Sequence, residues 1–177
     1  MTIAIERLDA GIRAMLKAHF EAMPGPDLRL RFGRALAPDG LATYVDGIDF
    51  VDDAVFGVRD ERRELVGVAH VAFETDLAEL GLSVLPAYRN RGIGSALFER
   101  AARHARNRRV REFIMRFLRS NVPVMRIAQR FGMKVVAEAA DADARLDLPP
   151  PSIASRVAEF LADTRARRNL RRPAPCS

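Results

Sequence analysis

Residues 82–97 read LSVLPAYRNRGIGSAL, and this stretch decides the fold. A strand runs to Leu85, a loop follows, and a helix opens at Ile93. The first backbone N–H groups of a helix have no intrahelical partner and the helix dipole is positive there, so an anion is favoured at this point. Gly92 and Gly94 carry no side chain that would block a close approach to the backbone. The stretch therefore predicts an anion site between a strand and a helix.

The polar residues of the loop narrow down the anion. Arg89, Asn90 and Arg91 add side-chain donors, and an arginine can hold two phosphate oxygens at once. A diphosphate fits these surroundings. A dinucleotide-binding turn would need Gly-x-Gly-x-x-Gly, and a P-loop would need Gly-Lys-Ser or Gly-Lys-Thr. The chain has neither pattern at this place, so both of these site types are excluded.

The pattern Arg89-x-x-Gly92-x-Gly94, in its strand-to-helix setting, resembles the acetyl-coenzyme A signature of the GNAT superfamily of N-acetyltransferases. The resemblance covers about residues 55–139. It implies an α/β fold of the GNAT type, with a mixed central sheet of about six or seven strands flanked by helices. It also implies acetyl-CoA as cosubstrate and an amine as acceptor.

A second segment resembles the same superfamily, because Asn121, Ala128 and Gly132-Met133 are spaced like its second motif. The resemblance implies that the strand before the loop splays from the strand at 110–118, with the pantetheine arm of the cosubstrate between them. The cofactor-binding residues implied by the loop and the two motifs are Leu82, Ser83, Val84, Leu85, Arg89, Asn90, Arg91, Gly92, Ile93, Gly94, Ser95 and Asn121. For Asn121, capping of the following helix is an equal explanation.

Acetyl transfer from a thioester to an amine needs a base more than an acid. Deprotonating an amine of pKa about 10.4 at pH 7 costs roughly 4–5 kcal/mol, and releasing a thiolate of pKa about 8.5 costs about 2 kcal/mol. In many GNAT members a tyrosine seven residues after the second-motif asparagine acts as the general acid, and this chain has Ala128 at that position. Some bacterial protein-lysine acetyltransferase domains also lack that tyrosine, and a glutamate on the central strand is taken as their base.

Glu79 is the matching glutamate, and strict alternation puts it on the same strand face as Gly81 and Ser83. We predict Glu79 as the general base, acting directly or through a water; an exposed glutamate at a strand end is the alternative. His70 is the next candidate, or a packed sheet residue. His19 and His104 have polar neighbours and are expected at the surface.

The predicted function is acetyl-CoA-dependent N-acetyl transfer, by direct attack, to a primary amine of a small molecule or a protein. One alternative is a catalytically silent acyl-CoA-binding sensor, which Ala128 keeps open. Another is a DNA-binding helix-turn-helix over residues 121–139, but residues 135–143 supply no basic recognition helix. We therefore do not expect nucleic acid as a partner.

Hydrophobic periodicity and turn residues predict a single α/β domain followed by a tail. Helices are expected over residues 8–20, 38–46, 93–106, 122–131 and from 153 onward, and strands over 55–59, 65–73, 78–85, 110–118, 134–139 and 144–148. The domain is expected at residues 1–148, and residues 149–177 form a basic C-terminal tail or helix with six arginines and two acids. The acceptor would bind among the opening helices and residues 28–53, where five aspartates either attract a cationic amine or only face solvent.

Composition sets outer limits. The net charge is +6, but much of the excess lies in the tail, and the eight arginines between residues 100 and 119 are interpreted as a solvated face. No apolar run approaches the roughly 18 residues of a membrane span, and the first residues lack a signal pattern, so a cytoplasmic location is expected. Cys176 is the only cysteine, which excludes an intrachain disulfide and a cysteine-ligated zinc; no metal is expected. A homodimer is left open.

Overall fold

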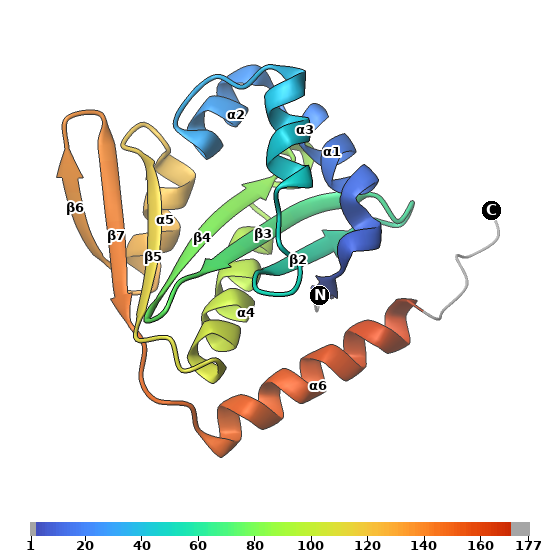
Figure 1. Ribbon diagram of the computed structural model, residues 1–177, viewed down its shortest axis with the longest axis vertical. Helices are drawn as coiled ribbons and strands as arrows, with labels where there is room; N and C mark the ends of the chain where they lie inside the picture. Colours follow the sequence, from blue (N-terminus) through green and yellow to red (C-terminus); the bar gives the residue numbers. More distant parts are fainter. Residues whose placement is uncertain (1–2, 171–177) are drawn as a thin grey trace.

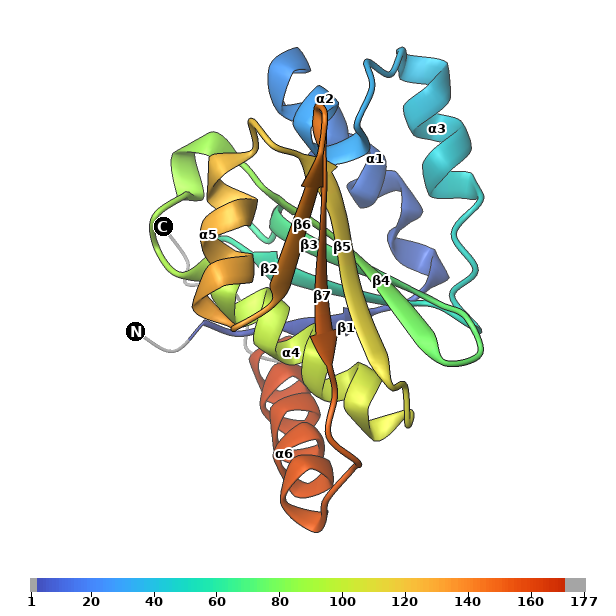
Figure 2. The ribbon, with the colours of Figure 1, turned by 90° about the vertical axis from the view of Figure 1, so that its left-hand side faces the viewer.

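The computed structural model describes residues 3–170, which form a seven-stranded mixed sheet with helices on both faces (Figures 1 and 2). The strand order is β1-β2-β3-β4-β5-β7-β6, and only the β4–β5 pair is parallel. The helices α1, α2 and α3 cover one face, and α4 and α5 cover the other. This confirms the predicted α/β class and strand number. Cys176, the only cysteine of the chain, lies outside the described residues.

The elements have the following bounds. The strands are β1 (Glu6–Leu8), β2 (Ala54–Arg59), β3 (Leu65–Phe73), β4 (Leu77–Val84), β5 (Glu112–Leu118), β6 (Lys134–Glu138) and β7 (Asp141–Asp147). The helices are α1 (Arg13–Glu21), α2 (Gly25–Phe32), α3 (Pro38–Asp46), α4 (Ile93–Asn107), α5 (Val122–Arg130) and α6 (Ile153–Leu170).

The first helices differ most from the expectation. Leu8 belongs to strand β1, so the opening helix begins only after a 3₁₀ turn and ends at Glu21. The Pro24-Gly25-Pro26 run follows this helix, and Pro26 stands in the first turn of α2, a helix that was not predicted. Proline is tolerated in a first turn, where its missing N–H has no intrahelical partner anyway. By contrast, α3 has the predicted bounds.

Two apolar clusters hold the layers together. One lies between the sheet and α4–α5 and includes Phe56, Leu80 and Phe98; the other lies under α1–α3 and includes Leu16 and Phe20. All five side chains are almost fully buried. Burying each contributes about 1.5–3 kcal/mol, so the sheet is fixed from both faces.

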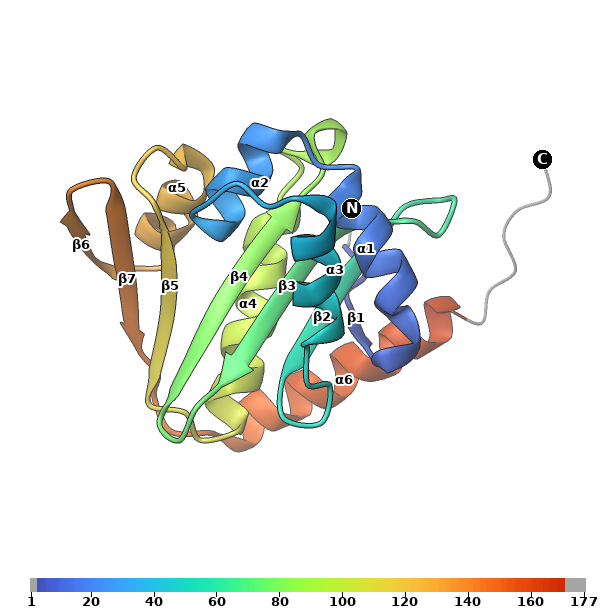
Figure 3. The same cartoon turned by 45° about the horizontal axis from the view of Figure 1, so that its top comes forward.

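The strands β4 and β5 pair only at their beginning. The register runs from Leu77 opposite Glu112 to Glu79 opposite Ile114, after which β5 pairs only with β7. From there on β4 and β5 diverge, as Figure 3 shows. The predicted splay is thus present, and α2 contacts both strands across it.

The C-terminal helix α6 docks on α4 through charges. Arg100 of α4 is 3% exposed and pairs with Glu159 at 2.8 Å and with Asp163. His104, also buried, contacts Glu159 at 2.6 Å. The expectations of a solvated Arg100 and a surface His104 were therefore wrong, because helix α6 covers both side chains. Four large apolar side chains of α6 are exposed to solvent instead: Ile153, Val157, Phe160 and Leu161.

We expect Glu159→Gln to lower the free energy of unfolding by about 2 kcal/mol at pH 7, because it leaves a buried guanidinium with one acid fewer. Burial raises the pKa of Glu159, but hydrogen bonds from His104, Asn107 and Arg100 outweigh it and lower the pKa to about 2. Because the pKa is lowered on folding, the ionised Glu159 stabilises the folded protein fully above pH 4.5, and this stabilisation is lost as the pH falls toward 2. The Glu159→Gln variant should therefore lack this part of the decrease in stability at acid pH.

Urea unfolding from pH 7 to pH 2 measures this effect. Glu99→Gln is the control, because Glu99 is an exposed glutamate on helix α4, next in sequence to Arg100. Equal stability of Glu159→Gln and wild type would show that α6 is not anchored by this pair. Whether residues 1–148 fold alone stays a prediction, which the truncated chain tests in the same assay.

Candidate functional site

The loop between β4 and α4 leads into helix amides that have no hydrogen-bond acceptor among residues 3–170. Gly92, the N-cap of α4, has φ 82° and gives no side-chain cap to the helix. Glycine adopts this left-handed conformation without steric cost. Asn90 is also left-handed, with φ 59°, which tightens the turn. The first amides of α4 are therefore left without an intrahelical acceptor, as the anion site requires.

The two loop arginines are held by the protein itself. Arg89 donates from Nε to the carbonyl of Val84 at 3.0 Å and pairs with Asp27 of α2 at 2.9 Å. Arg91 donates to the carbonyl of Ala87 at 2.9 Å and covers the ring of Tyr88. Arg89 thus connects the loop to β4 and α2, whereas Arg91 contacts only other residues of the loop in these interactions.

A cavity of about 430 Å³ lies at the splay, walled by β4, the loop, α2 and the first turns of α4 and α5. The predicted cofactor-binding residues in its wall are Leu82, Ser83, Val84, Arg89, Asn90, Gly92, Ile93, Gly94, Ser95 and Asn121. Two predicted residues, Leu85 and Arg91, are not part of this wall. The volume falls in the range of about 300–1,000 Å³ that is common for small-ligand sites.

Three cations in the cavity wall were not predicted. They are Arg31 from α2 and Arg126 and Arg130 from α5. With Arg89 they make four arginines against a single acid in the wall, Asp27, which Arg89 neutralises. Such a positive wall suits a polyphosphate. The spacing of Arg126 and Arg130, four residues apart on one helix face, was the available sequence signal.

Two residues of the second motif have different surroundings: Asn121 lines the cavity, and Ala128 lies in the hydrophobic core. Asn121 accepts from the amide of Val124 at 3.3 Å and donates to the carbonyl of Leu30 at 3.2 Å. Capping of α5 by Asn121 is thus confirmed, and the same residue lines the cavity. Ala128 is fully buried in the core, and α5 instead turns Val124 and Ile127 toward the cavity.

Glu79 lies outside the cavity wall, at the base of the splay. Its carboxylate, 38% exposed, forms an ion pair with Arg116 of β5. Gly81 and Ser83, two and four residues further along β4, meet side chains of α2 and α1. These contacts put the alternating residues of β4 on the face that α1–α3 cover.

His19 is buried, not at the surface as expected. Its Nε2 lies 2.8 Å from Ser83 Oγ and its Nδ1 2.8 Å from the carbonyl of Leu65. Burial lowers the pKa of His19 to about 4, so the ring is neutral at pH 7. It donates from Nδ1 to the carbonyl and accepts from the serine, which fixes α1 to the cavity strand. No local pattern could reveal this, because both partners are distant in sequence.

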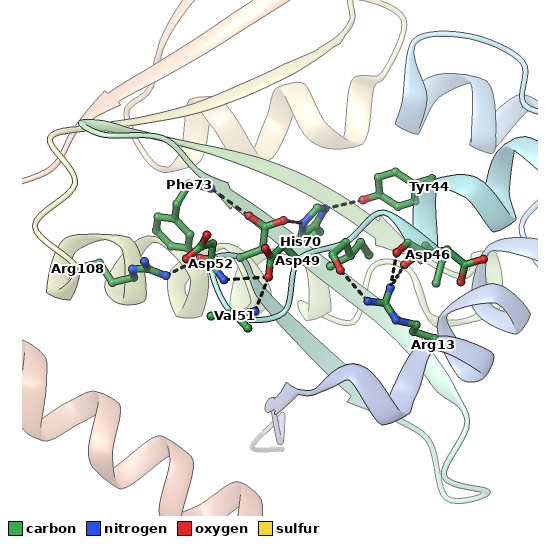
Figure 4. A network of polar contacts seen from close by, with 12 residues as sticks. Arg13, Tyr44, Asp46, Asp49, Val51, Asp52, His70, Phe73 and Arg108 are labelled. Atoms are coloured by element: carbon green, nitrogen blue, oxygen red, sulfur yellow. Dashed lines mark hydrogen bonds and ion pairs between the residues drawn. The ribbon is translucent and has the colours of Figure 1, made fainter.

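His70 is a packed sheet residue within a polar chain (Figure 4). Its Nδ1 lies 2.7 Å from Tyr44 Oη, and its Nε2 lies 2.9 Å from a carboxylate oxygen of Asp53. Burial lowers the pKa of His70 and raises the pKa of Tyr44, so both are neutral at pH 7. Both ring nitrogens of His70 are thus engaged with protein groups.

Of the five aspartates expected to attract an acceptor, three have side-chain contacts within the protein. Asp46 pairs with Lys17, Asp49 accepts from the amide of Val51, and Asp53 accepts from His70. Arg13 also donates to carbonyls at the end of α3, as Figure 4 shows. These acids therefore organise the α3–β2 connection.

Other site types find no support in the described residues. After α5 the chain enters strand β6, so the second helix of a helix-turn-helix is absent from residues 121–139. No cluster of three metal-ligating side chains occurs within residues 3–170. Over the same part of the chain, no helix has the length and apolar character of a membrane span.

Comparison with known proteins agrees with this geometry. A model of the acetyltransferase (GNAT) family matches residues 16–133. The GNAT domain of S. lividans PAT has a TM-score of 0.70 at 21% identity, covering 81% of this chain and 89% of that one. A ribosomal-protein-alanine N-acetyltransferase from Brucella melitensis has a TM-score of 0.67 at 17% identity, covering 82% and 100%.

YncA from Salmonella typhimurium, solved with its cofactor acetyl-CoA, has a TM-score of 0.65 at 15% identity, covering 86% and 97%. At these identities the structures show a shared fold. The family model adds the sequence evidence, because its match spans more than half of the chain and includes the loop, the splayed strands and every residue of the cavity wall. The chain belongs to the acetyltransferase (GNAT) family.

Proposed function

We propose that the protein is an acetyl-CoA-dependent N-acetyltransferase that moves the acetyl group to a primary amine by direct transfer. The observation that carries this proposal is the cavity at the splay. It combines free amides of a helix start, an unpaired strand edge and four arginines in one wall. A molecule with a diphosphate at one end and an amide-containing arm fits these three features together.

Each part of the wall has a defined role in this proposal. The amides of residues 92–95 bind the diphosphate, and Arg126 and Arg130 supply charge at the rim. The edge of β4 from Leu82 onward lacks a β5 partner, so its N–H and C=O groups can pair with the pantetheine amides. Acetyl-CoA supplies the thioester, and Glu79 accepts the proton of the attacking amine.

Isothermal titration calorimetry with acetyl-CoA, followed by thioester turnover against a panel of primary amines, tests the proposal. We expect heat of binding and turnover with at least one amine. Binding without turnover on any amine would favour a second function, an acyl-CoA sensor. The burial of Ala128 and the two α5 side chains that face the cavity, Val124 and Ile127, are the observations that favour this sensor. Absence of binding would contradict both.

A further inference from the structure

Arg31 lies against the backbone of the central strand. Its guanidinium reaches from α2 to β4, and a Cβ built on Gly81 would overlap it. The φ of Gly81 is not positive, so the backbone does not require glycine there. Glycine inside a strand often marks a close approach by another group, and here that group is Arg31. Arg31 therefore lies over Gly81, on the same face of β4 as Glu79 and Ser83.

The guanidinium keeps donors that the protein does not use. Of its five N–H bonds, one from Nη2 goes to Tyr44 Oη at 3.0 Å, while Nε is buried without a partner among residues 3–170. Within the same residues, no carboxylate lies within 4 Å of Arg31. Its positive charge in the cavity wall is thus not neutralised by an ion pair.

A hydrogen-bond chain holds this charge in place. An arginine only donates, so Tyr44 accepts from Arg31 and donates its own proton to His70 Nδ1. The neutral imidazole then carries its proton on Nε2 and donates to Asp53. This assignment gives each hydrogen bond of the chain one donor and one acceptor, and it leaves two neutral rings between the cation and the carboxylate. The chain orients Arg31 without cancelling its charge.

We propose that Arg31 binds the carbonyl oxygen of the acetyl thioester and stabilises the negative charge that this oxygen gains during transfer. The inference rests on the proposed function. Arg31 lines the cavity together with Leu82 and Ser83 and covers Gly81, which lies between these residues and Glu79 along β4. An acetyl group that passes from the cavity to an amine beside Glu79 must pass this guanidinium.

The carbonyl oxygen carries negative charge while the bonds rearrange. The lone pair of the neutral amine forms the C–N bond, and the C=O π pair moves onto oxygen. That pair re-forms the double bond when the C–S bond breaks and the thiolate leaves with the bonding pair. Glu79 takes one N–H proton. Arg31 faces the oxygen while it is charged, and a preorganised donor at such a position is typically worth about 100- to 1,000-fold in rate.

Arg31→Met tests the proposal, because it keeps an unbranched side chain and removes the donors. We expect the ratio of the affinities for acetyl-CoA and CoA, measured by calorimetry, to fall roughly 10-fold, since only acetyl-CoA has the thioester carbonyl. The bound signal of carbonyl-¹³C acetyl-CoA should move toward its free position, and turnover should fall about 100-fold or more. Arg29→Met is the control, because Arg29 is exposed on the same helix and outside the cavity wall.

Two further variants separate this role from a structural one. Gly81→Ala keeps the arginine but displaces its guanidinium, and should reproduce the loss of the ¹³C shift. Tyr44→Phe removes the positioning hydroxyl and should give a smaller loss of the same kind. Acetyl-CoA binding with an unchanged ¹³C shift and CoA preference in Arg31→Met would overturn the inference while leaving the proposed function standing. A loss of turnover confined to amines that carry a carboxylate would also overturn it, because Arg31 would then bind the acceptor.

Discussion

Replacing Gly94 by glutamate is expected to abolish detectable binding of acetyl-CoA while leaving the protein folded. Gly94 is in the first turn of α4 and lines the cavity. A carboxylate there occupies the helix amides and repels the diphosphate. At about 4 Å and an effective dielectric constant of 20 this repulsion is about 4 kcal/mol, so a loss of roughly 1,000-fold in affinity is expected.

The variant should fold because an acidic residue is favourable in the first turn of a helix. The new Cβ would lie 2.9 Å from the end of the Ile127 side chain, which can rotate away. Gly94→Gln is the matched control: it adds the same volume without the charge and should lose clearly less affinity. Calorimetry at two salt concentrations measures both variants. If glutamate and wild type bind acetyl-CoA equally, the diphosphate does not lie on this helix start.

The cavity wall could be predicted from the sequence where its signals are local. Gly92, Gly94 and the strand before them define a strand-loop-helix unit, and the structure places that unit at the cavity. Residues 38–46 were found as a helix because a proline opens it and a glycine follows its end. Strand β1 was missed, since three residues are too few to show an alternating pattern.

The remainder depended on contacts between distant residues. Arg31 has no local mark of function, and its helix was not predicted because the Pro24-Gly25-Pro26 run interrupts the helical pattern. The available signal was Gly81, a glycine inside a strand, which indicated that some group approaches the backbone there. His19 and His104 have polar neighbours along their helices, and only Ser83 and Glu159, far away in sequence, show why both are buried.

The largest rate effect outside the arginine site is expected at Glu79. Glu79→Gln should lower turnover about 100-fold or more at neutral pH, the usual scale for losing a general base, with little change in acetyl-CoA affinity. The fold should be unaffected, because the Glu79–Arg116 pair is 38% and 53% exposed and surface pairs contribute only about 0–1 kcal/mol. Arg116→Gln is the control for the lost ion pair and should keep most of the activity.

The pH profile identifies a base more specifically than the rate does. Raising the pH should partly restore Glu79→Gln, because a growing share of the amine then arrives already neutral. Ala128→Tyr should give little gain, since thiolate release is the smaller proton cost and residue 128 faces the core. Wild-type turnover with an unchanged pH profile in Glu79→Gln would remove Glu79 from the mechanism. A water would then be the next candidate, because both ring nitrogens of His70 are already engaged by Tyr44 and Asp53.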